Sequence, residues 1–207
     1  MAGSTGDRRL SFDNVPEIYD RARPTYPDPL FDEIFAYLRQ SSPVLRPAVV
    51  EIGPGTGQAT KSLLDRDAHV TAIEPGPQLA EFIRKKFRDT YTGQLEVVNV
   101  SFKDSVLSPE TYDLVVAATA FHWLDPNIRV EKCHSLLRAG GAIAIIGTNQ
   151  VRSAADRGFF DRVFPIYRRY RPNEPRTELP GADVVPAEHE EIKASGLFDA
   201  VTLRRYP

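Results

Sequence analysis

A run of apolar residues leads directly into three alternating glycines and then into a helical pattern. The stretch reads Val49-Val50-Glu51-Ile52-Gly53-Pro54-Gly55-Thr56-Gly57, and the helical pattern begins near Gln58. Glycine permits a positive φ and lets a ligand approach the main chain without a Cβ in the way. A helix that starts here directs its unpaired N–H groups toward the same place. The stretch therefore predicts a strand, a loop that binds a nucleotide-like cofactor, and a helix.

The glycine spacing narrows the choice of cofactor. A dinucleotide fingerprint, G-x-G-x-x-G, requires a glycine or alanine where this chain has Gln58. The pattern is instead Glu-x-Gly-x-Gly-x-Gly, and in this form the chain resembles class I S-adenosylmethionine-dependent methyltransferases. The resemblance implies that Glu51 orients the loop and the methionine end of the cofactor. It also implies that the loop backbone contacts that end, through Gly53, Pro54, Gly55, Thr56 and Gly57.

A second apolar run, residues 69–73, ends in the carboxylate of Glu74. An acidic side chain at the tip of the second strand can accept hydrogen bonds from both hydroxyls of a ribose. We therefore expect Glu74 and the adjoining Pro75 to contact the cofactor. The adenosine of S-adenosylmethionine or of NAD would satisfy Glu74 equally well, so this residue does not separate the two cofactors. The alternative is a surface glutamate at a strand end.

A third strand is predicted over residues 95–100, followed by a polar turn that contains Ser101, Phe102 and Asp104. In the family that the chain resembles, this turn contacts the adenine ring, and the resemblance implies that role for Ser101 and Phe102. Phe102 is equally well interpreted as a core residue, because an aromatic side chain beside a strand end is commonly packed inside.

A fourth strand, residues 112–118, is continuously apolar, as expected for a strand buried on both faces of a parallel sheet. The segment that follows, together with "LLRAGG" at residues 136–141, is the second resemblance to small-molecule methyltransferases. It implies that small residues let the methionine part of the cofactor lie against the strand end, and that Trp123 and a histidine face the reacting methyl group. The residues concerned are Ala118, Thr119, Ala120, His122 and Trp123.

His122 is the candidate catalytic residue. A histidine can act as a general base toward a hydroxyl or amine substrate. The alternative is that His122 only lines the pocket, because methyl transfer from a sulfonium can be driven largely by proximity and orientation. A carboxylate nucleophile would need no base.

The chain is predicted to form an α/β fold, a doubly wound, Rossmann-like and mostly parallel sheet with helices on both faces. Residues 48–148 form the cofactor-binding core, with a helix from Asp125 and Pro126 through Leu137 that Gly140 and Gly141 stop, and a fifth strand over 142–148. Residues 1–47 form an N-terminal lid and an amphipathic helix that begins at residues 28–29. By the resemblance, Tyr19 and Arg23 of the lid contact the cofactor; the alternative is a solvated arm.

Residues 149–207 are predicted to hold a substrate cap, the last helix and a sixth strand over 198–207. Between Arg152 and Arg176 there are seven arginines and three acids, mixed with aromatic residues. Such a segment can bind an anionic, partly apolar acceptor, although a solvated helix is the commoner cause of such charge. The resembled fold ends with an antiparallel strand, which we expect to be lacking.

Composition restricts the remaining function classes. The net charge of −2 argues against a nucleic-acid partner, and no apolar run approaches the ~18 residues of a membrane helix. We expect a cytoplasmic monomer or homodimer without a metal, because the sequence shows neither a signal peptide nor a metal motif. The single cysteine, Cys133, is expected to be a buried small hydrophobic residue.

These observations favour an S-adenosylmethionine-dependent methyltransferase that acts on a small molecule, with a carboxylate or hydroxyl as acceptor and S-adenosylhomocysteine as product. A non-catalytic cofactor-binding scaffold is the first alternative. An NAD-dependent oxidoreductase is the second, and it is disfavoured by Gln58 and by the lack of a Tyr-x-x-x-Lys pair.

Overall fold

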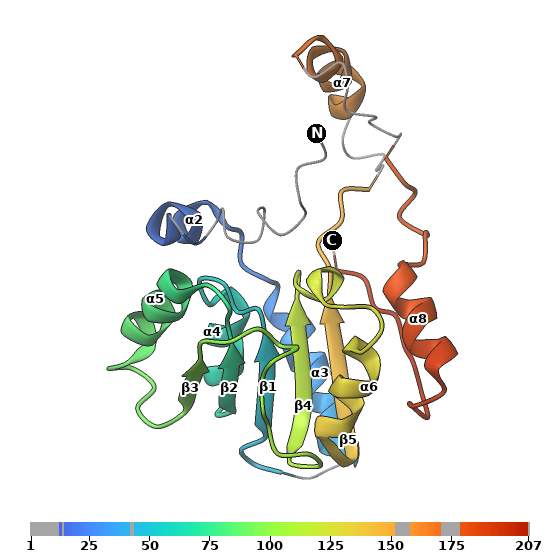
Figure 1. The fold of residues 1–207 in the computed structure, drawn as a ribbon. Coiled ribbons are helices and arrows are strands. Elements are labelled where there is room, and N and C mark those ends of the chain that lie inside the picture. The colour runs from blue at the N-terminus through green and yellow to red at the C-terminus, as the bar shows by residue number, and fades with distance from the viewer. Residues whose placement is uncertain (1–12, 14, 42–43, 152–157, 171–178, 207) are drawn as a thin grey trace.

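Five parallel strands form one sheet with the order β3-β2-β1-β4-β5 (Figure 1). The computed structural model describes residues 13, 15–41, 44–151, 158–170 and 179–206. The strands are β1 (Ala48–Ile52), β2 (His69–Ile73), β3 (Leu95–Val98), β4 (Tyr112–Ala118) and β5 (Leu137–Ile146). The helices are α2 (Pro16–Ala22), α3 (Asp28–Ser41), α4 (Gln58–Leu64), α5 (Pro77–Phe87), α6 (Arg129–Leu136), α7 (Phe159–Tyr170) and α8 (Ala187–Ser195), with a short 3-10 turn η1 (Phe121–Trp123).

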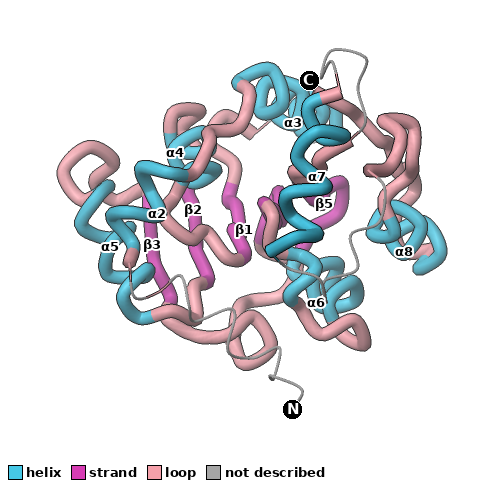
Figure 2. Tube along the Cα trace, turned by 90° about the horizontal axis from the view of Figure 1, so that it is seen from above, coloured by secondary structure: helices cyan, strands magenta, loops and turns pink. Residues whose placement is uncertain are grey.

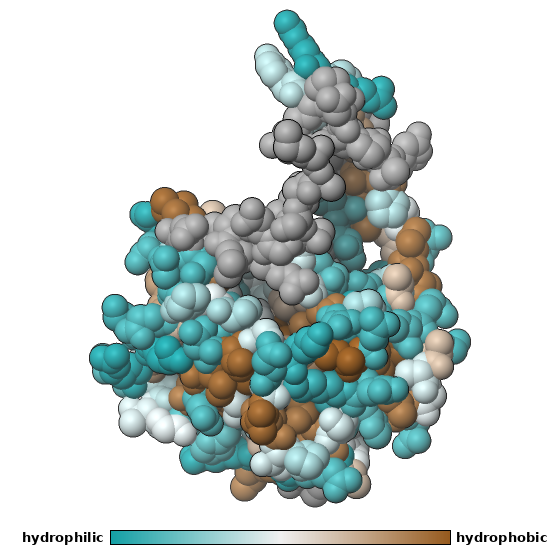
Figure 3. Space-filling model, viewed as in Figure 1, coloured by the Kyte–Doolittle hydropathy of each residue, from teal (hydrophilic) through white to brown (hydrophobic). Residues whose placement is uncertain are grey.

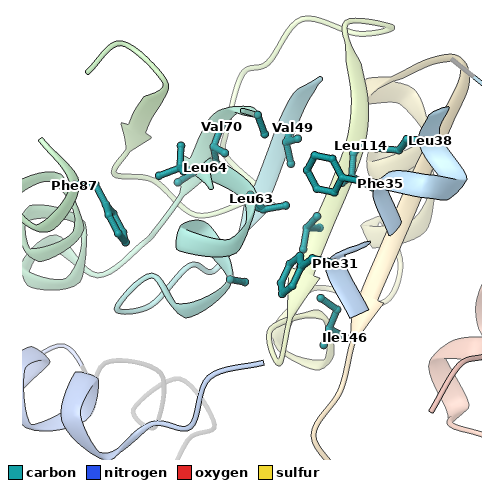
Figure 4. Packing of buried hydrophobic residues seen from close by; sticks show 14 of the residues in the cluster. Phe31, Phe35, Leu38, Val49, Leu63, Leu64, Val70, Phe87, Leu114 and Ile146 are labelled. Carbon is teal, nitrogen blue, oxygen red and sulfur yellow. The ribbon is translucent and has the colours of Figure 1, made fainter. Parts of the chain in front are cut away.

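Helices cover both faces of the sheet, as the sequence predicts. Successive residues of a strand point to opposite faces, so Val49 of β1 packs against α3, α4 and α5, whereas Val50 packs against α6 and α8. Figure 4 shows the first of these clusters, in which Phe31 and Phe35 of α3 and Leu63 of α4 meet the strands. The doubly wound α/β fold is therefore confirmed, and the amphipathic face predicted for the helix from residue 28 is buried.

The helix after β4 begins later than predicted. The carboxylate of Asp125 accepts a hydrogen bond from the N–H of Asn127 at 3.0 Å, within a turn over residues 126–128 that precedes the helix. Helix α6 then runs from Arg129 to Leu136. The prediction that this helix starts at Asp125 and Pro126 is therefore wrong, because local side-chain hydrogen bonding of aspartate favours the turn.

Gly140 and Gly141 lie inside β5 and do not stop α6. Strand β5 begins directly after α6, and its pairing with β4 shifts register between Tyr112 and Leu114. Gly140 has φ +78°, and a Cβ on Gly141 would lie 2.9 Å from the carbonyl oxygen of Arg138. The two glycines therefore permit an irregular start of β5, and the fifth strand begins earlier than the sequence predicts.

The predicted sixth strand is absent from residues 196–206, which the structure describes as irregular. Phe198 and Val201 pack against the cluster on the α6 side of the sheet, and Arg204 and Tyr206 contact the carboxylate of Glu33 on α3. Phe198 and Val201 of the predicted strand are thus partly buried without strand pairing. Within the described ranges, no strand pairs with the outer edge of β5.

Two segments lie beyond the carboxyl ends of the strands. Figures 1 and 2 show α2 over the β2 side of the sheet and α7 over the β5 side. Figure 3 shows hydrophilic residues over much of the viewed face, with smaller hydrophobic patches between them. In the part of the chain that is described, no helix has the length and apolar character needed to cross a membrane.

Candidate functional site

The candidate site lies where β1 and β4 are neighbours although they are not consecutive in the chain. In an open parallel sheet, the loops at such a point diverge from the carboxyl ends of the strands and leave room for a ligand. Here the glycine loop after β1 approaches the segment after β4. A Cβ on Gly53 would lie 2.8 Å from the Cβ of Ala120, so only glycine permits this approach.

The glycine loop has the backbone conformation that its sequence predicts. Gly53, Gly55 and Gly57 have φ values of +65°, +58° and +87°. Gly57 also serves the packing of two helices, because a Cβ there would lie 2.5 Å from the buried ring of Phe87 on α5. Pro54 and Thr56 are buried between these glycines. The third glycine therefore lets α4 pack against α5, a role that its place in the motif does not reveal.

Glu51 is buried at the end of β1, with 1% of its surface exposed. Its Oε2 accepts a hydrogen bond of 2.6 Å from the hydroxyl of Thr60 on α4. Its Oε1 has no hydrogen-bond partner among the described residues. Burial raises the pKa of the Glu51 carboxyl to about 7, against 4.5 for an ordinary glutamate, because the charged form is poorly solvated there.

Glu74 joins the tip of β2 to the glycine loop. One carboxylate oxygen accepts the N–H of Gly55 at 3.1 Å, and the other accepts the N–H of Gly76 at 2.8 Å. Burial raises the pKa of the Glu74 carboxyl, and these two backbone N–H groups oppose that shift. The Asn99 amide donates to the backbone carbonyl oxygens of Glu74 and of Pro75, which fixes the strand tip from β3. The sequence holds no signal for this contact, because the predicted strand runs past Asn99, whereas β3 ends at Val98.

The turn predicted to contact adenine is held by its own side chains and by α6. The Ser101 hydroxyl donates to the Asp104 carboxylate at 2.6 Å. Phe102 has 5% of its surface exposed and belongs to the core cluster, as its alternative interpretation predicts. Lys132 of α6 donates to the carbonyl oxygens of Lys103 and Ser105, and its Nζ lies 5.1 Å from the Phe102 ring centre. Burial lowers the pKa of Lys132.

Thr119, directly after β4, has an unusual backbone conformation. Its φ is +54°, which is costly for a residue with a Cβ. Its N–H donates to Ile146 of β5 at 2.7 Å, and its hydroxyl lies 2.9 Å from that of Tyr26. Ala118, the last residue of β4, and Trp123 of η1 are partly buried. Strained residues concentrate at functional sites.

His122 lies exposed on η1, with its ring centre 4.8 Å from that of Trp123 and the two planes tilted by 43°. Among the described residues, no carboxylate is paired with His122 that would orient it as in a catalytic dyad. Arg129 holds the start of η1, because its guanidinium donates to the carbonyl oxygen of Phe121. The same guanidinium pairs with Glu191 of α8.

The N-terminal segment lies against the glycine loop. A Cβ on Gly55 would lie 3.8 Å from the Tyr19 ring. The Arg23 guanidinium lies 5.5 Å from the centre of the same ring. Burial raises the pKa of Tyr19. Sequence reasoning missed Asp13, Asp20 and Tyr26 in this segment, because their partners lie 38 to 93 residues further along the chain.

No group of three metal-ligating side chains occurs within the described parts of the chain. The groups that form the candidate site are a glycine loop and two buried carboxylates, with hydroxyl and aromatic side chains around them.

Comparison with known proteins agrees with this arrangement. The profile of a family described as "Methyltransferase domain" matches residues 50–143. An uncharacterised methyltransferase of Geobacillus kaustophilus is 30% identical over 174 residues, which are 77% of this chain and 79% of that protein. An uncharacterised methyltransferase of Mycobacterium tuberculosis is 29% identical over 148 residues, 70% of this chain and 55% of that protein. The chain thus spans about half the length of this mycobacterial relative.

A solved structure shows the same fold at lower identity. It is a phosphoethanolamine N-methyltransferase of Haemonchus contortus, in complex with phosphomonomethylethanolamine and S-adenosylhomocysteine. The TM-score is 0.57 and the identity is 15%, over 92% of this chain and 43% of that one. The glycine loop, the sheet order and the extent of the match to the Geobacillus relative together place this chain in the class I S-adenosylmethionine-dependent methyltransferases.

Proposed function

We propose that the chain transfers a methyl group from S-adenosylmethionine to a small-molecule acceptor, in the cytoplasm and without a metal. The observation that carries the proposal is Oε1 of Glu51, which is buried at the start of the glycine loop and has no hydrogen-bond partner among the residues that the structure describes. A buried carboxylate oxygen without a partner is costly, and an ammonium group such as that of the cofactor's methionine end would satisfy it.

The other residues fit the same cofactor. Glycine at 53 and 55 leaves no Cβ on the loop backbone at these positions, and Glu74 and Pro75 form the strand tip where the ribose would bind. In this proposal the Ser101 turn borders the adenine, Tyr19 and Arg23 cover the loop, and Ala118 to Ala120 with Trp123 border the methionine end. The bound cofactor would supply an activated methyl group, and the protein would supply orientation and exclusion of water.

An anionic, partly apolar acceptor with a carboxylate or hydroxyl group fits the segment after β5. In α7, Arg162, Arg168 and Arg169 accompany exposed aromatic side chains on a helix that lies beyond the carboxyl ends of the strands (Figure 2). The other four arginines of this segment lie outside the described residues. Guanidinium groups can bind a carboxylate with two hydrogen bonds, which supports this acceptor class.

His122→Ala is expected to abolish turnover if His122 removes a proton from the acceptor. General bases of this kind contribute roughly 100-fold to 10,000-fold to the rate. Steady-state methyl transfer checks this, with S-adenosylhomocysteine affinity as the control for an intact cofactor site. A rate within a few-fold of the wild type would assign His122 to the pocket wall, consistent with its exposed position and the lack of an orienting carboxylate among the described residues.

The test of the proposed function is calorimetric titration of the full chain with S-adenosylhomocysteine and, separately, with NAD. We expect saturable binding of the first alone, followed by methyl transfer to small acids or phenols. Binding of NAD alone would favour an oxidoreductase and overturn the proposal. Binding of S-adenosylhomocysteine without turnover on any acceptor would favour the non-catalytic scaffold.

A further inference from the structure

The N-terminal strap, which we define as Asp13 and residues 15–26 with helix α2, is attached to the core at three separate points. At its start, the Asp13 carboxylate accepts the N–H of Leu79 at 2.8 Å, which caps the first turn of α5. At its end, the Tyr26 hydroxyl meets that of Thr119, beyond β4. Between these points lies Asp20, on α2.

Asp20 binds two elements of the core through a single oxygen. Its Oδ1 accepts a hydrogen bond of 3.0 Å from the Gln58 amide at the start of α4, and one of 2.6 Å from the Lys86 ammonium on α5. Lys86 also donates to the carbonyl oxygen of Thr56, within the glycine loop, at 2.9 Å. The side chains of Asp20 and Lys86 are 25% and 30% exposed, so water screens this pair only in part.

The strap closes the path to Glu74, the carboxylate at the tip of β2. Glu74 is 5% exposed, although a cofactor must contact it in the proposed function. Asp13 lies against the turn after Glu74, since a Cβ on Gly76 would lie 2.6 Å from Asp13 Oδ1. Tyr19, next to Asp20, lies over Gly55. A molecule as large as a nucleoside can therefore reach Glu74 only after the strap has moved.

We propose that Asp20 is the latch of this strap, and that its contacts with Gln58 and Lys86 set the rate at which the cofactor enters and leaves. The proposal rests on the proposed function and adds a positioning residue to it. Gln58 then has a role of its own: the position that is glycine or alanine in a dinucleotide loop here carries an amide that fastens the strap.

A latch has a kinetic signature that distinguishes it from a ligand contact. If Asp20 holds the strap closed in both the free and the bound protein, its removal raises the open fraction of both. Association and dissociation then become faster together, and the dissociation constant changes little. A residue that touches the ligand changes mainly the dissociation rate. A residue that only supports the fold changes the melting temperature and neither rate.

The experiment measures binding of S-adenosylhomocysteine to the captured full chain by surface plasmon resonance. Asp20→Ala is expected to raise both rate constants roughly fivefold to tenfold, the effect of losing a partly exposed charged hydrogen bond. Lys86→Met removes the other side of the same contact and is expected to raise both rate constants as well. The matched controls are Glu17→Ala, an exposed acid of α2, and Lys85→Met, an exposed lysine of α5, and both should leave the rates unchanged.

Each outcome is decisive. An increase in the dissociation rate alone would overturn the latch and make Asp20 a ligand contact. Unchanged rates in a folded Asp20→Ala protein would also overturn it. If Asp20→Ala fails to fold, the rates of Lys86→Met test the latch in its place. Absence of binding to the wild type would instead overturn the proposed function, and the latch with it.

Discussion

Glu51→Gln is expected to make stability less dependent on pH. In the wild-type protein the free energy of unfolding should fall by about 3 kcal/mol between pH 4.5 and 7, and the variant should not show this fall. Burial raises the pKa of Glu51 to about 7, whereas the unfolded chain has the ordinary value near 4.5. In this interval the folded protein binds more protons than the unfolded chain, so the free energy of unfolding decreases as the pH rises. Well above pH 7 both states are ionised, and the loss is complete.

The measurement is urea unfolding of wild type and variant at several pH values from 4 to 8. The difference in unfolding free energy between the two proteins should shift in favour of the variant by about 3 kcal/mol across this range. Using the difference removes the part of the Glu74 contribution that does not depend on the charge of Glu51. Glu96→Gln, on the exposed side of β3, is the control. A difference that stays constant with pH would show that Glu51 does not change its protonation state.

The same variant should lose cofactor affinity. Replacing the carboxylate by an amide removes the partner for an ammonium group, a loss of roughly 1.5–3 kcal/mol, which corresponds to about 10-fold to 150-fold in affinity. Wild-type affinity for S-adenosylhomocysteine should rise between pH 6 and 7.5, while that of the variant stays nearly flat. Calorimetry over this range checks both, because the α-amino group of the ligand remains largely protonated there.

Gly57→Ala is expected to destabilise the fold by about 2–5 kcal/mol. Two costs combine: a residue with a Cβ at φ +87° costs roughly 1–2 kcal/mol, and overpacking a core costs roughly 1–3 kcal/mol. The added Cβ would lie 2.5 Å from the Phe87 ring, which is 4% exposed and enclosed by the cluster around α4 and α5. That ring can move only by displacing its neighbours.

Gly93→Ala is the matched control, because Gly93 has φ +76° and nothing within 4 Å of the Cβ position. Only the backbone cost applies, so we expect a loss of about 1–2 kcal/mol. The midpoint of urea unfolding at constant slope measures both losses. Equal losses in the two variants would show that the contact with Phe87 does not limit position 57.

The local structure of the candidate site was predictable from the sequence where it is encoded by local spacing. The loop from Gly53 to Gly57 and the register of Glu74 depend on a strand, a turn and a helix that are consecutive, and the structure has all three. Local sequence led to a wrong helix start at Asp125, because an aspartate side chain closes a turn as readily as it caps a helix. Residues 198–206 carry a strand-like apolar pattern, yet burial without pairing produces that pattern too.

The contacts that sequence reasoning missed are long-range. Nothing near Asp20 indicates that Gln58 and Lys86 will meet its carboxylate, and nothing near Asp13 indicates the N-terminus of α5. Such contacts depend on the packing of complete elements, which periodicity and motifs do not specify. Glu74 illustrates the same limit: its position was predicted, but its hydrogen bonds to Gly55 and Gly76 were not.

The strap also has a consequence for how the protein is made. Asp13 and Asp20 reach partners 66 residues further along the chain, and Tyr26 reaches one 93 residues further. During translation the strap therefore leaves the ribosome well before α5 and β4 exist to receive it. It can dock only when most of the sheet has been synthesised, because non-local contacts form after the loops between them can close. The strap thus leaves the ribosome before the core segments that hold it, and it reaches its place only after they have formed.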